Sequence, residues 1–433
     1  MKRITTLCLV VFLACIFVAG DSFAGRERVL ERDFKVKAGK RLTLDLDTGG
    51  SLVITGWDKD MIFVHVEIGG KHRDEVEIDF DEGSSGLEIH SYYDRRKRNR
   101  SSNVDFEINV PDRFDISIDS KGGSIEIRSV EGQFKGKTMG GGIELEGLRG
   151  KVRLKTYGGS ITVEDSELDG KVETMGGSVR IEDVVGDLKG STMGGKVTYR
   201  NVRSSHSDDE GEEISITTPG GDIEADYKGR KVHAKTMGGD IDISSDEDVH
   251  ATTMGGDIDV GKGKEVNVTT FGGDINVEEA PAGAKVKTMG GDIKIGSAGE
   301  YVRATTMGGD IEIDAVDGWI KAKTMGGDVT VTMVGDPDRG KRDVEITSMS
   351  GDIILEVPSG LSMEFDIELA YTKKSRRNYK IKSDFEMNIE ETDDWEWKLG
   401  SPRKYIYGTG KVRGGKHMIK IRTINGNIYI REG

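Results

Sequence analysis

Eight aspartates of this chain could act together, because they recur at a nearly constant spacing, seven directly after a pair of glycines and Asp352 after Ser350-Gly351. They are Asp222, Asp240, Asp257, Asp274, Asp292, Asp310, Asp328 and Asp352. If the segments that carry them stack, their carboxylates form one column, and calcium prefers such oxygen ligands. Like charges in line also repel by about 1 kcal/mol per neighbouring pair in water, so the column needs a compensating partner.

Two features can supply that partner without a metal ion. Lysines recur beside the turn, namely Lys137, Lys155, Lys235, Lys287 and Lys323. An aspartate can also accept hydrogen bonds from nearby backbone N–H groups. The calcium-binding nonapeptide repeat needs a further glycine and aspartate within each nine residues, and these repeats lack them. We therefore interpret the aspartates as a structural column, with a calcium site as the alternative.

A second column consists of methionines placed directly before the glycine pair, or before Ser350-Gly351 in the last copy. Its members are Met139, Met175, Met193, Met237, Met254, Met289, Met307, Met325 and Met349, with Tyr157, Pro219 and Phe271 as substitutes. The ordinary interpretation is that these side chains fill a corner beside two glycines. An exposed row would instead offer an apolar stripe to a partner. The threonine before each methionine could form a ladder of hydroxyl groups.

No residue pattern typical of an enzyme is present. The seven histidines lack metal-ligand spacing, and neither a Gly-x-Ser-x-Gly motif nor a phosphate-binding loop occurs. We therefore predict a protein that is not an enzyme, with no catalytic, cofactor-binding or metal-binding residues and no cofactor. The alternative is a carbohydrate-cleaving β-helix with paired carboxylates on one face, but the short coils and few loops argue against it.

The elements that would position these columns follow from one repeat. The phrase Thr-Met-Gly-Gly-Asp, or a close variant, returns about every 18 residues through the middle of the chain. In residues 222–239, two segments alternate between apolar and polar side chains and are joined by glycine-rich turns, which predicts two short strands. A repeat this short cannot bury a core alone, so it must stack on its neighbours.

Two chain paths fit this repeat. In a parallel solenoid, identical residues lie about 4.8 Å apart on adjacent strands, whereas in an antiparallel meander they lie two strands apart. The near-invariant corner favours stacking, and crossovers between parallel strands are right-handed by default. We therefore predict an all-β protein: a parallel β-solenoid, as a right-handed β-helix, of about 13 coils of 17–18 residues, capped by less regular β segments at both ends.

Composition divides the chain into four segments. Residues 1–24 predict a signal peptide, with a charged start, an apolar stretch and a small-x-small site at its end; a lipoprotein signal ending at Cys15 is the alternative. Residues 25–119 form an N-terminal β segment or cap, residues 120–357 the repeat solenoid, and residues 358–433 a C-terminal β segment or cap. A corner-like phrase around Gly49 is expected to lie outside the regular stack. Two longer steps predict loops near residues 203–211 and 335–340.

Charge and cysteine content limit the chemistry of the mature chain. Both cysteines, Cys8 and Cys15, lie inside the predicted signal, so the mature chain would have no disulfide. No segment of the mature chain is apolar enough to span a membrane. The net charge of −15 argues against nucleic-acid binding. Basic runs at residues 95–100 and 373–377 are expected to be solvated loops or, alternatively, contacts to anionic lipid or cell-wall polymer.

Four stretches of the chain carry a family resemblance. They are Leu52-Val53-Ile54-Thr55-Gly56-Trp57-Asp58, the repeated Gly-Gly-Asp-Ile rungs, Lys382-Ser383-Asp384-Phe385 and Ile424-Asn425-Gly426-Asn427-Ile428-Tyr429-Ile430. From about residue 30 to its end, the chain resembles the bacterial β-strand-repeat family of unknown function that carries the name "putative adhesin". The resemblance implies an exported, β-helix-like protein with no known catalytic residues.

These features favour an exported, non-enzymatic β-solenoid that acts as an adhesin-like or scaffold protein and presents repeated surfaces for binding. The alternative is a carbohydrate-binding or carbohydrate-cleaving β-helix protein. The sequence does not identify the partner: a cell-envelope polymer, a glycan or further copies of the same chain are the candidates, and nucleic acid is not. The expected location is the periplasm, the cell surface or the extracellular space.

Overall fold

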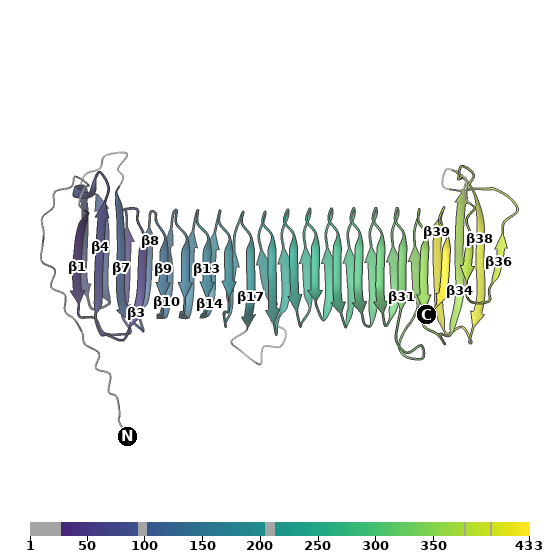
Figure 1. Ribbon diagram of the computed structural model, residues 1–433, viewed down its shortest axis with the longest axis horizontal. Coiled ribbons are helices and arrows are strands. Elements are labelled where there is room, and N and C mark those ends of the chain that lie inside the picture. Colours follow the sequence, from purple (N-terminus) through teal and green to yellow (C-terminus); the bar gives the residue numbers. More distant parts are fainter. Residues whose placement is uncertain (1–26, 94–101, 204–212, 376–377, 399–400) are drawn as a thin grey trace, which may run out of the picture.

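The computed structural model describes residues 27–93, 102–203, 213–375, 378–398 and 401–433 of the 433-residue chain. The predicted signal peptide, the basic run at residues 95–100 and nearly all of the loop at residues 203–211 lie outside the described residues, as do the last two residues of the run at 373–377. The molecule is an elongated flat stack whose strands cross its long axis (Figure 1). None of the described residues forms a helix long and apolar enough to cross a membrane.

The first sheet runs along the whole stack. Its 19 strands follow one another in the order β1 (Arg28–Phe34), β4 (Ile62–Gly69), β7 (Asn103–Pro111), β3 (Leu52–Trp57), β9 (Ile125–Arg128), β11 (Ile143–Glu146), β13 (Ile161–Glu164), β15 (Val179–Glu182), β17 (Val197–Arg203), β19 (Ile223–Lys228), β21 (Ile241–Ser245), β23 (Ile258–Lys262), β25 (Ile275–Ala280), β27 (Ile293–Ala298), β29 (Ile311–Val316), β31 (Val329–Met333), β33 (Ile353–Val357), β40 (Ile428–Glu432) and β35 (Ile381–Ser383).

Two further sheets form the opposite side. The second sheet has eight strands, β5 (Val76–Gly83), β6 (Gly86–Tyr93), β2 (Arg41–Leu46), β8 (Asp115–Ser120), β10 (Glu131–Thr138), β12 (Arg149–Thr156), β14 (Glu167–Thr174) and β16 (Leu188–Ser191). The third has 13, β18 (Glu213–Thr217), β20 (Lys231–Lys235), β22 (Val249–Thr252), β24 (Glu265–Thr269), β26 (Gly283–Lys287), β28 (Tyr301–Thr305), β30 (Trp319–Lys323), β32 (Val344–Thr347), β39 (His417–Ile424), β34 (Met363–Thr372), β38 (Ser401–Val412) and β36 (Asn388–Glu391), with β37 (Glu396–Lys398) beside β38. A single short helix, η1 (Arg73–Glu75), lies between β4 and β5 among the described residues.

Strands of successive repeats pair in parallel and in register. Ile241 of β21, for example, lies between Ile223 and Ile258 on its two neighbours. This pairing confirms the predicted parallel solenoid and excludes the antiparallel meander for the repeats. The right-handed winding and the number of coils stay predictions. Antiparallel pairs occur only near the two ends of the described stack, in β1, β4, β7, β5 and β6 and in β34 and β36–β38.

A thin core fills the space between the sheets. Its columns of isoleucine, valine and alanine face inward at every second strand position, and most members are at most 2% exposed. The alternation follows from strand geometry, because successive side chains point to opposite faces of a sheet. Each coil contributes only a few such residues, so the core exists only because the coils share it.

Threonine, rather than methionine, fills the corner beside the glycines. The threonine side chains are at most 3% exposed, and each hydroxyl donates a hydrogen bond to a glycine carbonyl of the preceding coil, over 2.7–3.3 Å. The second position of each pair must be glycine because the backbone of the preceding coil lies too close for a Cβ atom. A Cβ atom on Gly256 would lie 2.1 Å from the carbonyl oxygen of Gly239, whereas one on Gly255 would be 3.8 Å from its nearest neighbour.

At both ends of the stack, the spatial order of the strands differs from their order in the sequence. Strand β3 lies between β7 and β9, although it precedes both in the sequence. Strands β39 and β40 likewise insert between the coil of β32 and β33 and the outer strands β34 and β35 (Figure 1). The corner at Gly49 and Gly50 is therefore stacked on the one at Gly123, so the interpretation of Gly49 as lying outside the regular stack is wrong.

Candidate functional site

The predicted aspartate column exists, and backbone N–H groups hold it. Each Oδ1 accepts a hydrogen bond from the N–H of the residue at the same position in the next coil, as Asp274 does from Asp292 at 2.7 Å and Asp292 from Asp310 at 2.8 Å; for Asp352 that residue is Asn427. These charge-assisted bonds offset the repulsion along the column. The expected lysine partners are not used in this way: Lys137, for example, pairs with Asp119. No cluster of three metal-ligating side chains occurs among the described residues.

The methionine column is exposed along the whole repeat region. Eleven apolar side chains at these corners are between 37% and 56% exposed: Met139, Tyr157, Met175, Met193, Met237, Met254, Phe271, Met289, Met307, Met325 and Met349. We call them the methionine row. This exposure is too great for corner filling to be their whole role. Contiguous exposed apolar surface of this kind marks interaction sites in soluble proteins.

The outward surface of the first sheet is acidic and internally paired. Its cations bridge carboxylates on adjacent strands: Arg200 lies 2.7 Å from Glu224 and 3.3 Å from Glu182. Hydrogen bonds from Lys196 and Arg200 hold the pKa of the Glu224 carboxyl below its usual value. In the next coil, partial burial and the nearby Asp259 raise the pKa of Asp242.

The outward surface of the second sheet differs, because cations stand next to cations there. Lys135, Arg153, Lys171 and Lys189 occupy the same register position on β10, β12, β14 and β16, and all four are exposed. We call these four residues the lysine ladder. Adjacent strands place its members about 4.8 Å apart. Each neighbouring pair of like charges at this spacing repels by roughly 1 kcal/mol in water.

Most of the ladder has no counter-charge. Lys171 pairs with Glu173 at 2.7 Å. For Lys135, Arg153 and Lys189, the described part of the chain offers no carboxylate within 4.0 Å, and the adjacent Lys151 is likewise unpaired. Unpaired cations beside one another in a chain of net charge −15 are unusual, and they leave an anion-attracting surface.

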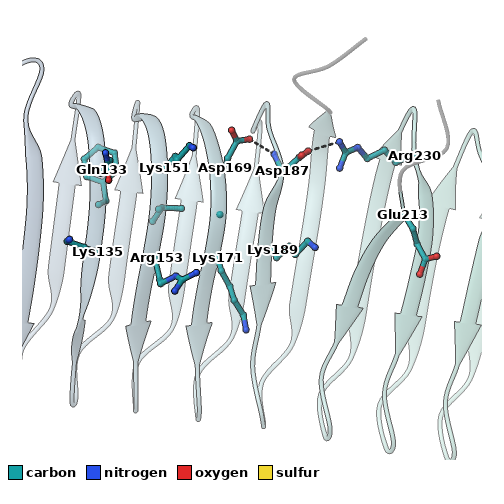
Figure 2. A pocket seen from close by; sticks show the side chains of 13 residues that line it. Gln133, Lys135, Lys151, Arg153, Asp169, Lys171, Asp187, Lys189, Glu213 and Arg230 are labelled. Carbon is teal, nitrogen blue, oxygen red and sulfur yellow. Dashed lines mark hydrogen bonds and ion pairs between the residues drawn. The ribbon is translucent and has the colours of Figure 1, made fainter. Parts of the chain in front are cut away.

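The ladder lies in a trough on the sheet. A depression of about 720 Å³ is lined by all four ladder residues and by Asp187, Glu213 and Arg230. Figure 2 shows these side chains along the strands. A second depression of about 610 Å³ continues toward β2 and β6. Lys135 and Arg153 line both depressions. The two together cross every strand from β6 to β16, so the trough runs along the long axis of the molecule.

A break in the sheet bounds one end of the trough. β16 and β18 form no ladder of hydrogen bonds; instead the N–H of Gly190 donates to the phenol oxygen of Tyr199 at 2.6 Å. Complete burial raises the pKa of that phenol. Beside the break, Asp187 forms an ion pair of 2.6 Å with the buried Arg230 (Figure 2). This ion pair therefore connects the two sides of the interruption between β16 and β18.

Sequence reasoning missed the lysine ladder, although a signal for it was present. Its four members follow one another at exact steps of 18 residues, the period of the repeat. The recurrent lysines noted from the sequence lie two positions closer to the corner, in the neighbouring column, where Lys155 is followed by Glu173. The absence of catalytic, cofactor-binding and metal-binding residues stays a prediction.

Comparisons with known proteins identify a matching family model and similar solved structures. The family model described as Toastrack DUF4097 matches residues 31–253 and 244–431. Similar solved structures include a "putative adhesin" from Bacteroides fragilis (17% identity, 62% of this chain and 97% of that chain covered, TM-score 0.26). Others are a "putative cell adhesion protein" from Clostridium sporogenes (10%, 94% and 100%, 0.17) and a "putative lipid binding protein" from Parabacteroides distasonis (13%, 62% and 96%, 0.27). No curated protein sequence matches the chain.

Proposed function

Because this chain belongs to the Toastrack DUF4097 family, we propose that it is an exported, non-enzymatic β-solenoid that presents repeated surfaces for binding, as an adhesin-like or scaffold protein. The observation that carries the proposal is the methionine row. Eleven half-exposed apolar side chains along one edge cost solvation free energy unless a partner covers them. The rigid stack keeps them in line, so one partner can meet many of them at once.

Export rests on residues 1–24, whose order of charged, apolar and small residues is typical of a secretory signal. Residues 25–119 and 358–433 are then the caps of a solenoid formed by residues 120–357. Intact-mass analysis of the exported protein should give a chain that starts at Gly25. A cytoplasmic full-length chain, or a lipid-modified Cys15 at the N-terminus, contradicts this processing.

Binding is tested by sedimentation of the purified chain with cell-envelope fragments. Replacing Met254, Met289 and Met307 together by glutamine should reduce co-sedimentation several-fold, because the row loses its apolar centre. Met418→Gln is the control, since Met418 is 41% exposed on β39 but lies outside the row. If the triple variant sediments as well as the unchanged protein, the methionine row is not the binding surface.

The same purified chain can be used to distinguish the proposed function from the alternative function. A carbohydrate-binding or carbohydrate-cleaving β-helix would bind a neutral glycan on an array, or would release reducing sugars from envelope polysaccharide. Either result, with no dependence on the methionine row, would favour that alternative.

A further inference from the structure

The cations of the lysine ladder differ from those in the middle of the first sheet, which are paired with carboxylates. On the first sheet, Arg180 and Arg200 are engaged by Glu182 and Glu224, whereas Lys135, Arg153 and Lys189 on the second sheet have no such partner among the described residues. The two surfaces are separated by the core, at a sheet spacing of about 10 Å. The outward side chains of the two sheets lie farther apart than this, beyond the Debye length of about 10 Å at 0.1 M salt, so the acidic side is largely screened from the ladder.

We propose that the trough over β10–β16 binds an acidic polysaccharide, which lies along the long axis with its anionic groups on the lysine ladder. This inference rests on the proposed binding function and names the partner of a second surface. A linear partner fits because the two depressions share Lys135 and Arg153 and together cross the strands from β6 to β16, about 30 Å at the strand spacing. An isolated small anion would meet only one or two of the four cations.

The polar groups between the cations favour a polysaccharide over other polyanions. Asp169 and Glu213 carboxylates and the Gln133 amide line the same depression (Figure 2). Carboxylates repel a polymer that carries only phosphates, but they accept hydrogen bonds from sugar hydroxyls. A chain that alternates anionic groups with hydroxyls can therefore satisfy both kinds of side chain.

Nucleic acid fits this surface less well. Single-stranded nucleic acids bind through aromatic side chains on which the bases stack, and β10, β12, β14 and β16 present no aromatic residue outward. Phosphates along one strand of a B-form duplex wind around the axis as they rise by about 3.4 Å per nucleotide, so only a few of them can face a straight row of cations at once.

The test measures binding of the full purified chain to heparin at several salt concentrations, with neutral dextran as the reference polymer. The Arg153→Gln/Lys171→Gln variant should bind heparin at least tenfold more weakly at 0.15 M salt. The slope of log affinity against log salt should fall by about 0.7–0.9 for each lost contact. Arg180→Gln/Arg200→Gln is the matched control, because it removes the same net charge from the first sheet; its affinity should change less than twofold. Thermal unfolding verifies that both variants are folded.

The outcomes separate this inference from the proposed function. Equal losses in the two double variants, or no heparin binding by the unchanged protein, overturn the ladder as a site. Tighter, ladder-dependent binding of polyphosphate or of a DNA duplex would overturn the assignment to a polysaccharide. If one of these results is obtained and the chain still sediments with envelope fragments through the methionine row, only this inference fails and the proposed function stands.

Discussion

The hydroxyl oxygen of Thr253 lies 3.0 Å from the carbonyl oxygen of Gly239, one coil earlier, and donates a hydrogen bond to it. The same oxygen accepts a hydrogen bond from the N–H of Gly256 in its own corner, at 3.3 Å. One buried side chain thus closes its own turn and connects that turn to the preceding coil. The arrangement recurs along the stack, which explains why the corner sequence varies so little.

Replacing Thr253 by valine should lower the free energy of unfolding by about 1–3 kcal/mol, because it leaves the buried Gly239 carbonyl without its donor. Valine keeps the shape of the side chain, so packing changes little. Thr252→Val is the control, since Thr252 faces outward beside it. Chemical denaturation of both variants measures the difference, and equal losses would contradict the role of the buried hydroxyl.

The two glycines of one corner should respond differently to alanine. Gly256→Ala should cost about 3 kcal/mol or more, because its Cβ atom would lie 2.1 Å from the backbone of the preceding coil and the two coils would have to separate. Gly255→Ala should change stability by less than about 1 kcal/mol, since its Cβ atom finds only ordinary contacts and alanine reduces the freedom of the unfolded chain. Urea denaturation tests the pair; similar losses at both positions would refute the close-approach argument.

The aspartate column should hold without calcium. Asp292→Ala removes the acceptor for the N–H of Asp310 and should cost about 1 kcal/mol, whereas Asp292→Asn keeps an acceptor oxygen and should cost less. A chelator should leave the melting temperature of the unchanged protein within a few degrees. A fall of tens of degrees would instead show that a bound cation supports the column.

His417 should make the fold sensitive to acid. It is 4% exposed, its Nδ1 accepts a hydrogen bond from the N–H of Arg342, and burial together with Lys416 and Arg342 lowers its pKa below the usual 6.5. As pH falls below 6.5, the unfolded chain takes up this proton before the folded chain does, so stability declines down to the folded pKa.

His417→Gln should therefore lose less stability than the unchanged protein between pH 7.5 and pH 5, because it lacks the imidazole whose pKa is lowered in the folded chain. His90→Gln, a half-exposed site on β6, is the control for loss of a histidine. Thermal unfolding across this range measures the effect. If the His417 variant is as acid-sensitive as the unchanged protein, the buried imidazole is not the cause.

Much of the fold could be predicted from the sequence, because the repeat length fixes which residues align. A step of 17 or 18 residues places Ile241 beside Ile258 and Asp257 beside Asp274, so the parallel register, the core columns and the aspartate column follow from counting. The exchanged order at the ends could not be predicted in this way. β3 and β40 alternate as the repeat strands do, so their own patterns do not set their places in the stack; these depend on which exposed sheet edge each strand covers.

The candidate sites depended more on tertiary structure. The sequence alone determined that Lys135, Arg153, Lys171 and Lys189 recur at the repeat period, and that methionine precedes most of the glycine pairs. It did not determine which cations find a carboxylate, because ion pairs form across neighbouring strands and depend on what the adjacent coil presents. The exposure of the methionine row was decided in the same way: the buried threonine occupies the corner, and the methionine beside it is left facing solvent.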